Sequence, residues 1–143
     1  MSASVPPVIV DTNIFFSALL SVHSKFSELL QRSDRSFFIC EYVVVELFKH
    51  KERIAARSKL ADEDLLMSYY LLLRRVTVYK EDLISTDNRR TAFHFCQGID
   101  ENDVAHVALT LELDGLLWTG DRKLKNGLQR KGFTQFFDPS TIS

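Results

Sequence analysis

Four acidic residues stand where they could bind a divalent metal ion. Asp11 directly follows a β-branched run, and Asp121 closely follows a second apolar run near the end of the chain. Asp103 opens an Ala/Val-rich stretch, and Glu46 lies in an apolar stretch that ends in charged residues. Carboxylate oxygens are the ligands that hard cations prefer, and a cation offsets the repulsion between grouped carboxylates. These residue types favour Mg²⁺ or Mn²⁺ chemistry.

Each of the four also has a purely structural interpretation. Asp11, Asp103 and Asp121 precede predicted helices, and aspartate is a favoured N-cap because its carboxylate accepts free backbone N–H groups. Glu46 alone fits a solvated helix surface. Only the joint pattern, four carboxylates brought together by the fold, favours a metal site over helix caps.

Strands that alternate with helices are expected to position these residues. Strands are predicted at 8–10, 36–40, 76–79, 115–119 and 133–137, and helices at 14–20, 26–30, 41–56, 62–75, 88–96, 103–113 and 121–130. Such alternation implies a parallel sheet covered by helices on both faces. The predicted fold class is therefore α/β, with three layers (α/β/α) and a central parallel sheet of about five strands.

This topology predicts where the acidic residues meet. In an open parallel sheet, functional groups collect at the edge where strands end and helices begin. Asp11 and Asp121 each follow a predicted strand, so both are expected at that edge although they are far apart in sequence. Asp103 begins the helix that leads into the strand before Asp121, and Glu46 lies early in the helix after the second strand.

The composition is that of an ordinary globular domain. With 143 residues, 45% hydrophobic and 26% charged, the chain fits a single domain over residues 1–143. No stretch approaches the roughly 20 apolar residues of a membrane span, and residues 1–7 lack the features of a signal peptide. Cys40 and Cys96 form no CxxC pair and are expected to be reduced thiols. We therefore expect a cytoplasmic protein.

The net charge of −1 provides no overall attraction to nucleic acid, so cations near the site would have to supply it. Arg122 and Lys123 directly follow the last acidic candidate and are the best candidates for phosphate contacts. The histidines have no metal-ligand spacing, and His106 is expected to be a packed core residue. With five glycines, the chain has no Gly-rich phosphate loop, and no Ser-His-Asp or Cys-His pattern is visible.

Three blocks of the sequence resemble the PIN-domain family. Val8 to Asn13 is similar to its opening, a hydrophobic strand followed by Asp-Thr-Asn. Asp100 to Leu109 and Leu117 to Asp121 resemble its closing half, in which an acidic residue starts an Ala-rich helix and a strand ends in Thr-x-Asp. The blocks stand in the family's order and spacing over Val8 to Phe137. Thr110 stands where the family often has a small residue.

The resemblance implies a metal-dependent ribonuclease that uses Mg²⁺ or Mn²⁺. The residues that match the family's acidic quartet are Asp11, Glu46, Asp103 and Asp121, and those that match its supporting polar residues are Asn13 and Thr119. We assign direct metal contacts to Asp11 and Asp121, and a second ion or the water around it to Glu46 and Asp103.

Two assignments within this quartet stay open. Glu41 and Glu52 are alternatives to Glu46, because the sequence around all three is generic. Asp100 lies one helical turn before Asp103 and is a further candidate ligand.

Many small members of the family are toxins of bacterial toxin–antitoxin pairs, so the resemblance implies RNA as substrate and an antitoxin protein and a second copy of the chain as partners. Two other functions remain open. A PIN-like fold can act as a binding or scaffold module without activity. An Asp-nucleophile phosphatase would use Asp11 covalently, but its common pattern has a second aspartate where this chain has Asn13. Metal-dependent cleavage of single-stranded RNA would separate the three.

Overall fold

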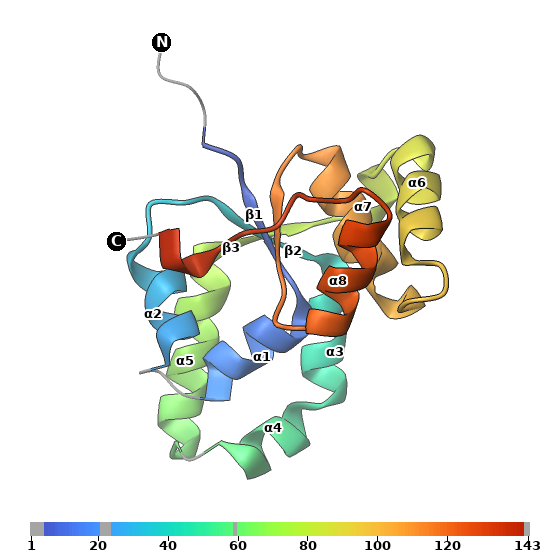
Figure 1. The fold of residues 1–143 in the computed structure, drawn as a ribbon. Coiled ribbons are helices and arrows are strands. Elements are labelled where there is room, and N and C mark those ends of the chain that lie inside the picture. Colours follow the sequence, from blue (N-terminus) through green and yellow to red (C-terminus); the bar gives the residue numbers. More distant parts are fainter. Residues whose placement is uncertain (1–4, 21–23, 59, 142–143) are drawn as a thin grey trace.

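The computed structural model describes residues 5–20, 24–58 and 60–141, and a parallel sheet lies at its centre (Figure 1). Within these residues the sheet has four strands, namely β1 (Val8–Val10), β2 (Phe37–Cys40), β3 (Val76–Tyr79) and β4 (Leu116–Trp118). They lie in the order β3-β2-β1-β4, and each neighbouring pair is parallel. Parallel neighbours need long connections, and the helices between the strands supply them.

Helices cover both faces of this sheet, as predicted. The helices on one side are α1 (Thr12–Leu20), α2 (Lys25–Arg32) and α5 (Asp62–Arg75), and those on the other are α6 (Thr86–Cys96), α7 (Val104–Glu112) and α8 (Arg122–Arg130) (Figure 1). After β2 come α3 (Glu41–Lys49) and α4 (Lys51–Arg57). Short 3₁₀ turns are η1 (Glu81–Leu83), η2 (Glu101–Asp103) and η3 (Pro139–Thr141). The α/β fold class is confirmed.

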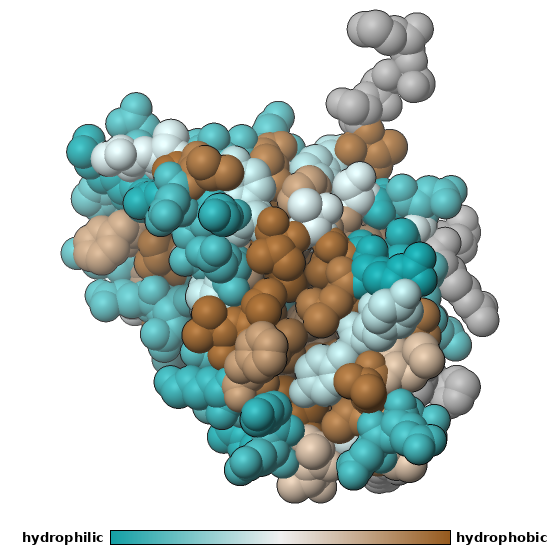
Figure 2. Space-filling model, turned by 180° about the vertical axis from the view of Figure 1, so that it is seen from behind, coloured by the Kyte–Doolittle hydropathy of each residue, from teal (hydrophilic) through white to brown (hydrophobic). Residues whose placement is uncertain are grey.

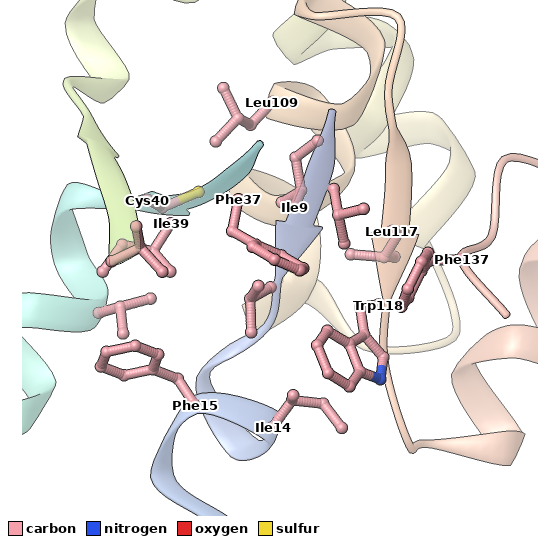
Figure 3. Packing of buried hydrophobic residues seen from close by; sticks show 14 of the residues in the cluster. Ile9, Ile14, Phe15, Phe37, Ile39, Cys40, Leu109, Leu117, Trp118 and Phe137 are labelled. Carbon is pink, nitrogen blue, oxygen red and sulfur yellow. The ribbon is translucent and has the colours of Figure 1, made fainter. Parts of the chain in front are cut away.

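The core lies on both faces of the sheet and fixes the ends of β1 and β4. Leu109 of α7 lies on one face, and Phe15 of α1 lies on the other (Figure 3). The ring of Trp118 packs against Phe37 and Phe137, with centroids 6.1 and 5.1 Å apart. Burying a side chain such as Phe15 contributes roughly 1.5–3 kcal/mol. The residues that follow β1 and β4 therefore start from rigid positions.

The predicted fifth strand at 133–137 is wrong as a full strand. In the described residues this segment forms a single parallel bridge, between Leu117 and Phe136. The N–H of Phe136 donates to the carbonyl of Thr134 within its own segment, at 2.9 Å. The bridge itself uses the N–H of Leu117, which donates to Gln135, and the N–H of Phe137, which donates to Leu117, both at 2.8 Å. The turn from Thr134 to Phe136 interrupts the extended backbone, so this segment adds one bridge rather than a fifth strand.

The predicted helix at 41–56 is two helices rather than one. The backbone at His50, with φ −111° and ψ 15°, leaves helical geometry between α3 and α4. The change of direction brings α4 against α1 and buries Ile54 in the core. The helix breaks at His50 because Ile54 packs into the core, and local helix propensity does not reveal this break.

The surface carries a broad apolar region on the face turned away in Figure 1 (Figure 2). Exposed large apolar residues include Phe48 of α3, at 71% exposure, and Leu66 of α5, at 70%. The edge strand β3 also leaves Val78 exposed. In the part of the chain that the structure describes, no helix has the length and apolar character needed to cross a membrane.

Candidate metal-binding and catalytic site

Asp11 occupies the carboxyl end of β1 and is almost completely buried, with 4% of its surface exposed. Its Oδ1 accepts the N–H of Ile14 at 2.8 Å, and its own N–H donates to the carbonyl of Trp118 at 3.1 Å. Burial raises the pKa of the Asp11 carboxyl, and Asp121 raises it further, while a hydrogen bond from Thr119 lowers it. The fold thus holds the Asp11 carboxylate in a buried position, shielded from solvent, between the ends of β1 and β4.

Three further aspartates converge beside it. Carboxylate oxygens of Asp100, Asp103 and Asp121 lie within 4.8 Å of one another. Asp100 directly precedes the short turn η2, Asp103 is the last residue of that turn, and Asp121 follows β4. As the topology predicts, Asp103, which precedes β4 in the sequence, and Asp121, which follows β4, meet at one edge of the sheet. Asp100, the further candidate from the sequence, belongs to this group.

Two of these aspartates also cap local structure. Oδ1 of Asp121 accepts the N–H of Leu124 at 3.1 Å at the start of α8, and Oδ1 of Asp100 accepts the N–H of Asn102 at 2.9 Å. Thr119 accepts the N–H of Asp121 at 3.1 Å and also bonds the carboxylate of Asp11. The capping interpretation and the metal interpretation are compatible, because a carboxylate has two oxygens and capping engages one.

The charges in this group oppose one another. Burial raises the pKa of the Asp103 carboxyl to about 7, and the neighbouring Asp100, Asp11 and Asp121 add to the increase. Carboxylates as close as those of Asp100, Asp103 and Asp121 stay ionised together only if positive charge offsets their repulsion. An all-oxygen, multiply negative donor set is what a hard divalent cation requires. The residues present therefore fit Mg²⁺ or Mn²⁺.

A cleft of about 900 Å³ opens beside these residues. The acidic residues that line it are Asp11, Glu46, Glu81, Asp82, Asp100, Glu101 and Asp103. Among its lining residues in the described part of the chain, Arg89 is the one cation. Asn13 is exposed at its rim, and the backbone N–H of Asn13 bonds the Asp11 carboxylate. The cleft is strongly negative, so a negatively charged phosphate can enter it only together with a cation.

Glu46 lines the cleft but lies outside the three-aspartate group. Its Oε2 is 3.0 Å from Nε2 of His50, one helical turn further along. The spacing i, i+4 makes this pair recognisable in the sequence. Arg122 and Lys123 are exposed in the first turn of α8 and do not line the cleft. Their contact with phosphate stays a prediction.

A hydrogen-bond network that the sequence did not reveal ties the site together. The hydroxyl of Tyr42 lies 2.7 Å from Nε2 of His106 and donates to the carbonyl of Asn102 at 3.2 Å. Thr12, next to Asp11, places its hydroxyl 3.3 Å from the same nitrogen of His106. The hydroxyl of Tyr42 therefore links α3 to the start of α1, next to Asp11, and to the η2 turn, which contains Asp103.

The protonation state of His106 gives this network a direction. Complete burial lowers the pKa of His106 to about 4, so the ring is neutral at physiological pH. Its Nδ1 is buried and has no hydrogen-bond partner among the described residues. An unpaired buried acceptor costs less than an unpaired buried donor, which favours the proton on Nε2. His106 then donates to Tyr42, and Tyr42 donates to Asn102, directly before Asp103.

Comparison with known families identifies the family of this chain. A family model described as PIN domain matches residues 9–136. The chain belongs to the PIN-domain family. No curated protein matches the sequence. PIN domains are generally nucleases that use divalent metal ions, and the group formed by Asp100, Asp103 and Asp121 agrees with that use.

Proposed function

We propose that this protein is a Mg²⁺- or Mn²⁺-dependent endoribonuclease that hydrolyses phosphodiester bonds in single-stranded RNA. The observation that carries the proposal is the convergence of Asp100, Asp103 and Asp121 beside the buried Asp11, in a chain of the PIN-domain family. A packing role alone does not explain three carboxylates within 4.8 Å of one another. A cation site explains the convergence, and a bound cation would offset the burial and the like charges that raise the pKa of Asp103.

The four aspartates would hold the metal, with Glu46 lining the cleft beside them. A divalent ion bound there supplies charge neutralisation at the phosphate and a water molecule of lowered pKa. Asp11 offers a carboxylate that the N–H of Ile14 and the hydroxyl of Thr119 hold in one orientation. Burial around Asp11 excludes bulk water, so charge interactions at this end of the cleft are strong. Asn13 supports the same carboxylate through its backbone.

The substrate contacts follow from the positions of the cations. Arg89 lines the cleft and its side chain donates to the carbonyl of Glu81, which holds the guanidinium at the cleft wall. Arg122 and Lys123 follow Asp121 in α8 and would meet phosphates on the outer side of that aspartate. These contacts are made with the ground state and the transition state alike, so they affect binding more than the chemical step.

Two partners form part of the proposal. The small size of the domain and its family support a toxin controlled by an antitoxin protein in the cytoplasm. The exposed apolar residues of α3 and α5, including Phe48, Leu66 and Tyr70, support a homodimer, because large exposed apolar surfaces usually mark contacts.

The test is cleavage of a labelled single-stranded RNA by the purified protein with Mn²⁺, with Mg²⁺ and with EDTA, beside a DNA strand of the same sequence. We expect internal cleavage of the RNA with either metal and none with EDTA. Binding of RNA without any cleavage would instead support a non-catalytic binding module. Release of phosphate from a monoester at a rate above that of RNA cleavage would support an Asp-nucleophile phosphatase.

A further inference from the structure

A second groove lies beside the acidic cleft and shares three lining residues with it. The groove has a volume of about 380 Å³ and lies between α1 and the α3–α4 segment, which contact each other (Figure 1). Thr12, Asn13 and Glu46 line both the cleft and the groove. A chain-like ligand can therefore pass from one to the other without leaving the surface.

The groove differs from the cleft in charge. His50, Arg53 and Arg57 line it. Arg53 and Arg57 are four residues apart on one face of α4, and His50 directly precedes this helix. Among its described lining residues, Glu46 is the one acid, and it pairs with His50 at 3.0 Å. Arg53 and Arg57 are exposed, and neither has a carboxylate within salt-bridge distance in the described part of the chain. Two guanidinium groups thus remain available.

The floor of the groove is apolar. Phe16 and Leu20 of α1 and Ile54 of α4 form it, and Phe16 is its one aromatic residue among those described. Bases of a single strand stack on aromatic side chains, while arginines follow the backbone phosphates. An apolar floor below two free arginines combines both features.

We propose that this groove binds the part of the RNA strand next to the scissile phosphate, with Arg53 and Arg57 on backbone phosphates and a base against Phe16. The inference rests on the proposed ribonuclease function and assigns it a substrate path. The acidic cleft repels the rest of a polyanion, so affinity must come from cations outside it. The groove offers those cations in direct continuity with the cleft, through Asn13 and Glu46.

The test measures RNA binding in an Asp11→Asn background, which keeps the strand uncut. Replacing Arg53 and Arg57 together by alanine should raise the Kd for an RNA of about twelve nucleotides roughly tenfold and reduce the salt slope by about 1.4, or about 0.7 per phosphate. Arg53→Lys with Arg57→Lys should restore most of the salt slope, because charge is kept. The matched control is Arg90→Ala with Arg130→Ala, two exposed cations that line neither cavity.

Length dependence sharpens the test. For an RNA of about four nucleotides centred on the cleavage site, the double alanine variant should raise the Kd less than for the longer strand. Phe16→Leu should weaken binding of the longer RNA roughly fivefold while keeping the apolar volume. Trimming the RNA from either end then identifies the end that lies in the groove.

The outcomes separate this inference from the proposed function. An unchanged Kd in the double alanine variant overturns the groove, even if the wild type cuts RNA normally. An equal rise in the control variant also overturns it, because general charge would then explain the effect. If the variant loses affinity for an acidic peptide but not for RNA, the groove is a protein site and the inference is wrong. If the wild type cuts no RNA but the double variant still loses RNA affinity, the groove stands and the ribonuclease proposal fails.

Discussion

The cleft and the groove differ in how firmly the fold holds their charged groups. In the cleft, Asp11 is 4% exposed and bonded to Ile14 and Thr119, and next to the cleft Asp121 caps a helix. In the groove, Arg53 and Arg57 extend from a seven-residue helix into solvent. Backbone contacts therefore fix the carboxylates, whereas the arginines keep most of their rotamer freedom.

This difference separates chemistry from affinity. Groups that stabilise a transition state must be oriented before the reaction, because reorganisation during the reaction raises the barrier. Groups that contact phosphates along a flexible strand need only charge and reach. Substitutions in the cleft should thus change the rate of cleavage, and substitutions in the groove should change binding.

The largest expected effect is at Asp11. Asp11→Asn keeps the shape of the side chain and can still accept the N–H of Ile14, but it removes a charge that the metal site needs. We expect single-turnover cleavage to fall by a hundredfold to a thousandfold or more, on the order seen when one preorganised charge interaction is lost. RNA affinity should stay or rise, because a negative charge has gone. A normal cleavage rate would remove Asp11 from the chemistry and contradict the separation of roles.

The Tyr42 network should show an intermediate effect. Tyr42→Phe removes the nearer acceptor of the Nε2–H of His106 and leaves the more distant hydroxyl of Thr12. The variant also frees the carbonyl of Asn102, and together these losses should lower the free energy of unfolding by about 1 kcal/mol. Because Asn102 precedes Asp103, Mn²⁺ affinity should fall roughly tenfold, as when groups that orient metal ligands are removed. Tyr70→Phe, at an exposed tyrosine of α5, is the control. Loss of stability with unchanged Mn²⁺ affinity would limit Tyr42 to a packing role.

The smallest expected effect is on the stability of the metal-free protein. The folded-state pKa of Asp103 is about 7, against an ordinary value of 3.8, so the folded state binds the proton more tightly than the unfolded chain. That contribution is present at low pH and is lost as pH rises from about 4 to about 7. Asp103→Asn should therefore raise the melting temperature relative to wild type at pH 8 by roughly 2–4 °C, and less at pH 5. The melting temperatures are measured in EDTA. If Asp103→Asn and wild type differ by the same amount at both pH values, ionised Asp103 does not destabilise the folded protein.

Much of the fold follows from local sequence features. The predicted bounds of α5 and β3 agree with the structure to the residue, because acidic residues open the helix and Arg74 and Arg75 close it. The break at His50 and the early end of the last segment were not predictable locally. The break at His50 accompanies packing against a distant segment, with Ile54 buried in the core, and the last segment combines a local turn with its one bridge to Leu117.

The same distinction holds for the candidate site. Topology alone predicts that Asp11 and Asp121 meet, since each follows a strand of one parallel sheet. Nothing local marks Tyr42 and His106 as partners, because 64 residues separate them and each type is common in cores. The pairing of Glu46 with His50 is local and was predictable from its spacing.

The most direct test of the central claim is calorimetric titration of Mn²⁺ into the wild type and into Asp103→Asn at pH 8, with Asp62→Asn at an exposed position of α5 as control. Metal binding requires ionised ligands, so the wild type should bind at pH 8 and more weakly at pH 5.5, below the pKa of Asp103. The Asp103 variant should lose at least about tenfold in affinity, and the control should match the wild type. Absence of binding by the wild type at pH 8, or equal binding by the Asp103 variant, would contradict a metal site built by these aspartates.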